Sequence, residues 1–369
     1  MELISTSCKG NSKSMFRIFL ISSLIILCSC SSAENISQEP VDNNRDIYFP
    51  PINSDEWETA SISELNWNTS ELQPLLIYLE DKNSKSFIML HRGKMVVEAY
   101  FDGHSAISPW YWASAGKTLT TAITGIAQDE NLLTLNDKVS DHLGEGWTSL
   151  SSDKEQLITN RNLLTMTSGL DDFSENIATE NLNYVADAGE RWAYHGVYVK
   201  LQDVVSEASN QSWDNYFSSK LKNKIGMSGA WIPMGLANVY WSNTRSMARF
   251  ALLTSANGKW EDEQIIPETY LQDATSTSQN LNEAYGYMWW LNGKSTYMLP
   301  QSQFLFQGKL IPNAPDDMYC ALGKNDQKIY IVPSKDLVII RMGNPADGDN
   351  FALSDFDNQL WAKINALIN

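Results

Sequence analysis

Two segments at opposite ends of the chain have the pattern of a β-hairpin, and they constrain the fold more than any other feature. Residues 87–100 form two apolar runs around Gly93, and residues 328–342 form two more around Pro333–Asp336. Short apolar runs that flank turn residues predict paired strands. Residues 353–368 have the spacing of an amphipathic helix, and helical spacing dominates the middle of the chain. We therefore predict an α/β (α+β) fold: an antiparallel sheet flanked by N- and C-terminal helices, with an all-helical inserted subdomain over roughly residues 131–285.

The composition indicates a large soluble domain with an acidic surface. The chain has 369 residues, of which 43% are hydrophobic, and its formal net charge is −17. A chain of this length and composition can bury a large core. Affinity for nucleic acid depends on basic residues, so we expect no nucleic-acid partner. The acidic surface is most simply explained by solubility.

The N-terminus resembles a lipoprotein signal. Lys13 and Arg17 precede an apolar run at residues 18–27, and the sequence Leu27-Cys28-Ser29-Cys30 follows. A basic segment, a short apolar segment and a small-residue cleavage site are typical of a signal peptide. We predict a signal peptide at residues 1–29 and lipid on Cys30. A plain secretory signal and an uncleaved anchor are the alternatives, and either Met1 or Met15 could be the true start.

The polar, acidic residues after this signal predict a flexible tether over residues 30–47. The folded domain is expected to cover residues 48–369. Several acyl chains would hold the protein on a membrane, because one chain alone binds only marginally. The predicted location is the cell envelope of a bacterium, on a membrane outside the cytoplasm. The sequence does not identify the membrane or the oligomeric state.

Ser114 and Lys117 are the candidate nucleophile and base. Residues i and i+3 lie on the same face of a helix, so the lysine amine can approach the serine hydroxyl. Burial would lower the pKa of the lysine and let it remove the serine proton. Ser151 with Lys154 and Ser219 with Lys222 have the same spacing, but both pairs lie in polar stretches. Only Ser114 leads into an apolar helical segment.

The cysteines and histidines predict no cofactor or metal. Three of the four cysteines lie in the first 30 residues, and Cys320 is predicted to be a packed thiol. The four histidines lack the spacing of metal ligands. There is also no dinucleotide fingerprint and no Gly-x-Ser-x-Gly motif.

Several stretches together resemble the serine β-lactamase and penicillin-binding protein superfamily, in its class C, esterase and 6-aminohexanoate-dimer hydrolase branch. They occur in family order over residues 48–368. The resemblance implies a β-lactamase/transpeptidase-like fold. The matching stretches are residues 114–117, 163–170, 189–194, 247–250, 258–260, 265–267, 285–290 and 329–333.

The second motif of the family, Tyr-x-Asn, is altered in this chain. Its match is Tyr194-His195-Gly196, which keeps the tyrosine and replaces the asparagine with glycine. The resemblance implies that Tyr194 holds or relays the proton between Ser114, Lys117 and the leaving group, because a phenol near a lysine can act as acid or base. The lost amide removes a polar contact to the substrate or to Lys117. Without the resemblance, Tyr194 would be read as a core tyrosine.

The third motif of the family, Lys or His followed by Ser or Thr and then Gly, is altered as well. It aligns with Ala321-Leu322-Gly323, followed by Lys324. Gly323 permits close backbone approach. By the resemblance, the N–H groups of Ser114 and Lys324 would form the oxyanion hole. The missing cation weakens the case for substrates that present a carboxylate, such as penicillins and peptidoglycan stem peptides, so ester or other amide substrates are favoured.

Trp110 and Trp112 precede Ser114 and, with Gly323, are candidate pocket residues, although aromatic residues more often fill cores. The predicted function is a membrane-anchored serine hydrolase that cleaves a small-molecule ester or amide through an acyl-serine intermediate. One alternative is a D-alanyl carboxypeptidase or β-lactamase. The other is a surface lipoprotein that has lost catalysis and serves in binding.

Overall fold

A six-stranded antiparallel sheet joins the two predicted hairpins. Its strand order is β2-β1-β13-β12-β11-β8, and β1 pairs with β13 so that Ile88 lies opposite Ile340. Strands from the early and the late part of the described chain therefore pair within one sheet, and the predicted mixed helix and antiparallel sheet architecture is confirmed. The strands are β1 (Ser84–His91), β2 (Lys94–Tyr100), β8 (Trp290–Leu291), β11 (Tyr319–Gly323), β12 (Gln327–Val332) and β13 (Leu337–Gly343).

The computed structural model describes residues 46–174, 176–348 and 352–369. The predicted signal peptide, Cys30 and almost all of the predicted tether lie outside the described residues. Within the described part of the chain, no helix combines the length and the hydrophobicity needed to cross a membrane.

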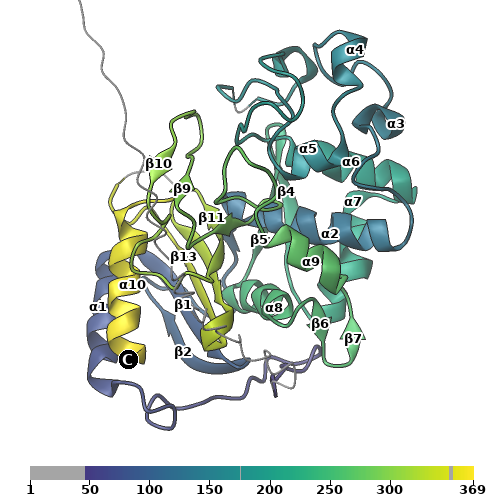
Figure 1. The fold of residues 1–369 in the computed structure, drawn as a ribbon. Coiled ribbons are helices and arrows are strands. Elements are labelled where there is room, and N and C mark those ends of the chain that lie inside the picture. Colours follow the sequence, from purple (N-terminus) through teal and green to yellow (C-terminus); the bar gives the residue numbers. More distant parts are fainter. Residues whose placement is uncertain (1–45, 175, 349–351) are drawn as a thin grey trace, which may run out of the picture. The chain divides into compact units, whose positions relative to one another are not determined.

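The N- and C-terminal helices lie together on one face of the sheet (Figure 1). They are α1 (Leu72–Asp81) and α10 (Asp355–Ile368). A capping box between Ser354 and Asp357 starts α10 and satisfies backbone donors at its N-terminus. Phe356 stacks on Tyr78, with ring centroids 5.9 Å apart, which joins the two helices. The apolar face of α10 is therefore buried, as its sequence spacing predicts.

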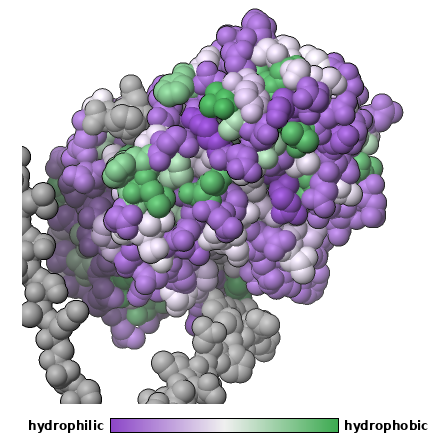
Figure 2. All heavy atoms as spheres, turned by 45° about the horizontal axis from the view of Figure 1, so that its top comes forward, coloured by the Kyte–Doolittle hydropathy of each residue, from purple (hydrophilic) through white to green (hydrophobic). Residues whose placement is uncertain are grey.

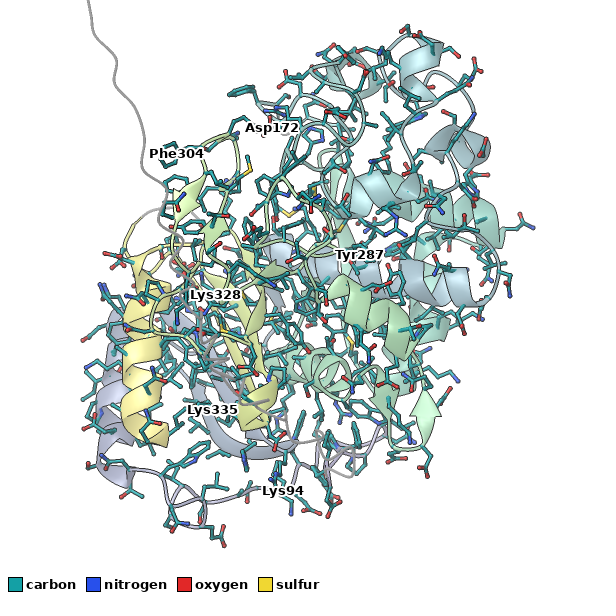
Figure 3. The ribbon with its side chains drawn as sticks, in the orientation of Figure 1. Lys94, Asp172, Tyr287, Phe304, Lys328 and Lys335 are labelled. Carbon is teal, nitrogen blue, oxygen red and sulfur yellow. The ribbon has the colours of Figure 1, made fainter. Side chains whose placement is uncertain are left out.

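Buried charges tie α10 to this face of the sheet. Lys328 Nζ lies 2.8 Å from Asp357 Oδ2 and 3.1 Å from Asp326 Oδ1, and all three side chains are almost completely buried. Figure 3 labels Lys328 in the interior beside α10. Buried charges are tolerated only when they are paired and hydrogen-bonded. Burial lowers the pKa of nearby Arg341 to about 10.

Helix α8 (Thr244–Ser255) covers the opposite face of the sheet. Its Thr244 hydroxyl donates to Ser86 Oγ of β1 at 2.6 Å and contacts Met342 of β13. Arg249 of α8 is buried and donates to the carbonyls of Pro51 and Ser54. This helix therefore fixes the start of the described chain as well as the sheet.

The segment between the hairpins is mostly helical but also contains short strands, so it is not all-helical as expected. Strands β3, β5 and β4 form a three-stranded sheet, and β6 pairs with β7. Besides α8, the α-helices of this segment are α2 (Lys117–Asp129), α3 (Val139–Leu143), α4 (Ser152–Glu155), α5 (Asn160–Leu164), α6 (Tyr198–Ser209), α7 (Trp213–Phe217) and α9 (Glu268–Ala274). The strands are β3 (Trp110–Tyr111), β4 (Ala230–Met234), β5 (Ala237–Ser242), β6 (Lys259–Trp260) and β7 (Glu263–Gln264), and a separate hairpin is formed by β9 (Thr296–Tyr297) and β10 (Phe306–Gln307).

Apolar side chains on the surface occur in separate patches among polar residues (Figure 2). The most exposed large ones include Ile107, Phe173 and Phe304. Scattered exposed apolar residues are ordinary for a folded protein. The face shown in this view is mainly hydrophilic.

Candidate active site

Ser114 lies in a tight turn that connects β3 to α2. The turn is a 3₁₀ helix, Ala113–Gly116, and α2 begins only at Lys117. Ser114 and Lys117 therefore lie at the head of the helical segment, with the serine in the 3₁₀ turn and the lysine at the first position of α2. Ala113 has a φ of 48°, which places it in the left-handed region. A non-glycine residue remains there only when its surroundings hold it.

Hydrogen bonds on both sides of Ala113 hold this turn. The Trp112 N–H donates to Tyr240 O of β5 at 2.9 Å, and the Ala115 N–H donates to Trp112 O at 3.1 Å. Ser114 is thereby fixed at the junction of the small sheet and α2.

Lys117 places its amine on the Ser114 hydroxyl. Lys117 Nζ lies 2.8 Å from Ser114 Oγ, and the lysine is 7% exposed. The burial follows from the position of α2, in which residues 117–127 are all buried. A serine hydroxyl and a lysine amine in direct contact, shielded from water, are the arrangement in which the amine can take the serine proton.

Tyr194 completes a cluster of three side chains. Lys117 Nζ lies 4.8 Å from the centroid of the Tyr194 ring. Burial raises the pKa of Tyr194 to about 12, and a hydrogen bond with Ser114 opposes part of this rise. The phenol is therefore protonated at neutral pH. The structure brings together the three residues that the sequence proposes for proton transfer.

Met166 positions the segment that carries Tyr194. It has a left-handed backbone, with a φ of 58°. Its carbonyl accepts the Ala193 N–H at 2.8 Å, and its Sδ accepts the His195 N–H at 3.4 Å. The Tyr194 ring also stacks on Trp290, with centroids 5.8 Å apart. Sequence reasoning assigned no role to Met166, although it lies in one of the stretches that carry the family resemblance.

His195 is buried beside this cluster and is held in the loop. It is 4% exposed, and its Nε2 lies 3.2 Å from Ser174 O. Burial lowers the pKa of His195, and the charge of nearby Lys117 adds to this effect. The imidazole therefore favours its neutral form. Nearby, Arg191 and Asp172 form an ion pair at 2.7 Å, and Asp172 is labelled in Figure 3.

Tyr198 is a further aromatic contact of Lys117. Its ring centroid also lies 4.8 Å from Lys117 Nζ, and its hydroxyl donates to Asn238 O of β5 at 2.6 Å. Sequence reasoning missed this residue. The sequence feature that could have revealed it is a second tyrosine four residues after Tyr194, where a helical pattern begins.

The end of β11 lies directly against the serine turn. A Cβ on Gly323 would be 2.5 Å from Trp112 O and 3.1 Å from Ala115 N. Only glycine fits this approach, as its place in the third motif predicts. The side chain of Lys324, the next residue, is exposed.

Side chains hold the hairpin turn after Gly323 by donating hydrogen bonds to its backbone carbonyls. Arg341 donates to Asn325 O at 3.1 Å and to Asp326 O at 3.0 Å, and Gln327 donates to Asn325 O at 2.8 Å. Asn325 Nδ2 also donates to Tyr111 OH at 2.6 Å. These contacts join the turn to β3 and β13, and so to the elements that flank Ser114.

The two tryptophans proposed for the pocket have structural contacts instead. Trp112 is completely buried, and its Nε1 donates to Ser242 Oγ at 2.8 Å, so its assignment as a pocket wall is corrected to the core. Trp110 is half-buried, and its Nε1 donates to Gly343 O of β13 at 3.2 Å. The sequence indicated aromatic packing before Ser114 but could not distinguish a pocket from the core.

A family model described as β-lactamase matches residues 81–360. This chain belongs to the β-lactamase family. A comparison with curated proteins found no similar sequence. The matched region of this β-lactamase family member includes the serine turn, Tyr194 and the end of β11.

Solved structures share its fold. A protein assigned as a 6-aminohexanoate-dimer hydrolase from Bacillus anthracis has a TM-score of 0.66 and 19% identity, over 87% of this chain and 88% of that one. A protein assigned as a β-lactamase from Bacteroides dorei has a TM-score of 0.65 and 16% identity, over 82% and 99%. A class C β-lactamase from Rhodobacter sphaeroides has a TM-score of 0.58 and 13% identity, over 81% and 98%. At these identities the likeness shows the fold alone.

Among the described residues of this β-lactamase family member, no group of three or more His, Cys, Asp or Glu side chains could hold a metal ion. Cys320 is buried within β11, and burial raises its pKa well above the usual value for a thiol. It is therefore a poor nucleophile at neutral pH. Ser114, in contrast, contacts both Lys117 and Tyr194.

Proposed function

We propose that this protein is a serine hydrolase that cleaves an ester or amide through an acyl-Ser114 intermediate. The observation that carries the proposal is the 2.8 Å contact between Lys117 Nζ and Ser114 Oγ, with Tyr194 against both groups. Lys117 takes the proton as Ser114 Oγ bonds to the substrate carbonyl carbon. Tyr194 passes the proton to the leaving oxygen or nitrogen, and water then releases the acyl group by the same steps.

The N–H groups of Ser114 and Lys324 are the proposed oxyanion donors. The contact of Gly323 with the serine turn supports this assignment, because it brings the end of β11 beside Ser114. Backbone donors fixed in advance stabilise the negative charge of a tetrahedral intermediate without reorganisation. Arg341 and Gln327 hold the turn in which Lys324 lies.

An ester or a non-peptidoglycan amide is the proposed substrate. The third motif has no cation at Ala321, which is buried, and the Lys324 side chain is exposed. A substrate carboxylate therefore has no buried positive partner from this motif. The family resemblance to esterases and 6-aminohexanoate-dimer hydrolases agrees with this choice.

The test is turnover of a chromogenic short-chain ester, together with labelling by a fluorophosphonate. Ser114→Ala is expected to abolish both, because the acyl acceptor is removed. Ser151→Ala is the matched control: it belongs to another Ser-x-x-Lys pair, but Lys154 pairs with Asp187 at 2.7 Å. The control is expected to retain turnover and labelling. Unchanged turnover in Ser114→Ala contradicts the proposal, and a wild type without labelling favours a binding lipoprotein that has lost catalysis.

A D-alanyl carboxypeptidase or β-lactamase is the second candidate, because the family and two of the structural relatives bear the β-lactamase name. A fluorescent penicillin would label Ser114 if this candidate is correct. Ester turnover with neither penicillin labelling nor penicillin hydrolysis excludes it.

Lipid attachment at Cys30 is proposed from the sequence Leu27-Cys28-Ser29-Cys30. It would place the hydrolase on a bacterial membrane outside the cytoplasm. Cys30→Ser is expected to move the protein from the detergent phase to the aqueous phase of a phase separation. Equal partition of Cys30→Ser and wild type contradicts the anchor.

A further inference from the structure

Two tyrosine rings face the amine of Lys117. The ring centroids of Tyr194 and Tyr198 each lie 4.8 Å from Lys117 Nζ. Tyr194 belongs to the loop that Met166 holds, and Tyr198 is the first residue of α6. The two rings therefore reach the amine from different elements.

The hydroxyl of Tyr198 is directed away from the proton-transfer groups. It donates to Asn238 O at 2.6 Å. Asn238 Nδ2 donates to Gln202 Oε1 at 2.9 Å, and Gln202 Nε2 donates to Thr120 Oγ1 of α2 at 3.1 Å. This chain of hydrogen bonds links α6, β5 and α2. The hydroxyl is therefore engaged away from Lys117, and the face of the ring meets the amine.

The face of an aromatic ring attracts an ammonium ion, because the ring quadrupole is negative there. The attraction to a neutral amine is much weaker, so the two rings distinguish the protonation states of Lys117. The effect is larger where water is excluded, and both Lys117 and Tyr198 are buried. Gly196, at the asparagine position of the second motif, has no side chain that could contact the ammonium ion.

We propose that Tyr198 is a positioning residue that stabilises protonated Lys117 through its ring face, in place of the amide missing at Gly196. This inference rests on the proposed serine hydrolase function. As Ser114 attacks, its O–H bond breaks, the proton moves to Lys117 Nζ, and the Oγ–carbon bond forms. The ammonium ion exists from this point until the proton reaches the leaving group. The ring of Tyr198 stabilises this state without taking a proton itself.

Other groups around Lys117 also affect its protonation. Ser114 contacts the amine from the serine turn, and Tyr194 contacts it from the loop. His195 is close enough that the lysine charge lowers its pKa. A test must therefore change the ring of Tyr198 and keep these three residues.

The test follows the titration of Lys117 by NMR in protein labelled at lysine ¹³Cε, with the signal assigned from its loss in Lys117→Met. Tyr198→Leu removes the ring face, so we expect the midpoint of the Lys117 titration to fall by about 0.5–1.5 pH units. Tyr198→Phe keeps the ring and loses only the bond to Asn238, so its midpoint should stay within about 0.2 unit of wild type. A Leu midpoint that is unchanged or higher, or equal shifts in both variants, overturns the proposal.

A second series avoids loss of folding in Tyr198→Leu. Phenylalanines with one, two and three ring fluorines at position 198 keep the ring and progressively weaken its negative face. The Lys117 midpoint is expected to fall stepwise with fluorination, and the absence of a trend overturns the proposal. The titration needs no turnover, so it separates this inference from the hydrolase assignment. Where ester turnover is present, the acidic limb of kcat/KM should move with the same midpoint.

Discussion

Tyr194 is the residue whose chemistry is best defined by its surroundings. Burial raises its pKa to about 12, so its hydroxyl is protonated from pH 6 to 9. A protonated phenol is a proton donor, not a base, so in the proposed mechanism Lys117 is the base in the free protein. The role proposed for Tyr194 is to deliver a proton to the leaving group.

Tyr194→Phe is expected to lower kcat/KM for an ester by about 10²- to 10⁴-fold, because it removes this proton donor. The melting temperature should change little, since the ring keeps its stacking on Trp290. Turnover and thermal unfolding are measured on the same samples. Tyr285→Phe is the matched control: its buried hydroxyl has no hydrogen-bond partner among the described residues, and its ring lies 6.2 Å from that of Tyr194. Equal losses in both variants contradict the assignment.

Sequence reasoning at the residue scale found Ser114, Lys117 and Tyr194 because motifs record residue identity at fixed spacing. It did not find Tyr198 or Met166, because their contacts depend on how a loop returns to α2. It misplaced Trp112 for a similar reason. An aromatic residue beside a nucleophile can face a pocket or the core, and only the pairing of β3 with β5 decides between them.

At the scale of elements, the cluster of Lys328, Asp326 and Asp357 joins the β11–β12 turn to α10. Asp326 lies in the turn that follows Lys324, and Asp357 lies in the first turn of α10. Arg341 holds the carbonyls of the same turn. The position of the Lys324 N–H, the proposed oxyanion donor, thus depends on the buried charges of Lys328, Asp326 and Asp357.

Lys328→Met is expected to destabilise the protein by about 3–5 kcal/mol, because two buried carboxylates lose the cation that they share. The free energy of unfolding is measured in urea. Lys309→Met is the control, because it breaks an exposed pair with Asp316 and should cost at most about 1 kcal/mol. A loss in Lys328→Met no larger than in the control contradicts the structural role of the cluster.

The elements that the sequence predicts well are those with a clear period. Apolar runs on both sides of a glycine turn reveal β1 and β2, and helical spacing reveals α6, α8 and α10. Strand β11 gave no such signal, because it has only five residues and so short an apolar run does not distinguish a strand from a buried helix. The two-residue strands β3 and β8 are too short to show a pattern. The same limit applies to the two-residue strands β6 and β7, which lie in the region that was expected to be all-helical.

At the scale of the whole molecule, the candidate site joins parts with different stability. Gly323 comes from the end of the large sheet, and Lys117 opens a buried helix. Tyr194 comes from the segment 165–197, and among its described residues, 165–174 and 176–197, the 3₁₀ turn η3 (Thr179–Asn181) is the only strand or helix. Irregular segments open locally at lower free energy than sheets and buried helices.

Ester turnover is therefore expected to fall at lower urea concentrations than the helical circular dichroism signal. The loop with Tyr194 should open before the sheet and α10 unfold. Both curves are recorded at equilibrium on one urea series, with intrinsic tryptophan fluorescence as a third probe. Coincident transitions by all three probes would show instead that the loop unfolds together with the rest of the domain.

The left-handed backbone of Ala113 has a consequence for protein engineering. Glycine adopts this conformation at less cost than alanine, so Ala113→Gly would relieve strain. The same change would let the adjacent serine sample more orientations. Glycine at this position would therefore favour thermal stability but loosen the orientation of Ser114. A search for more stable variants should keep alanine there.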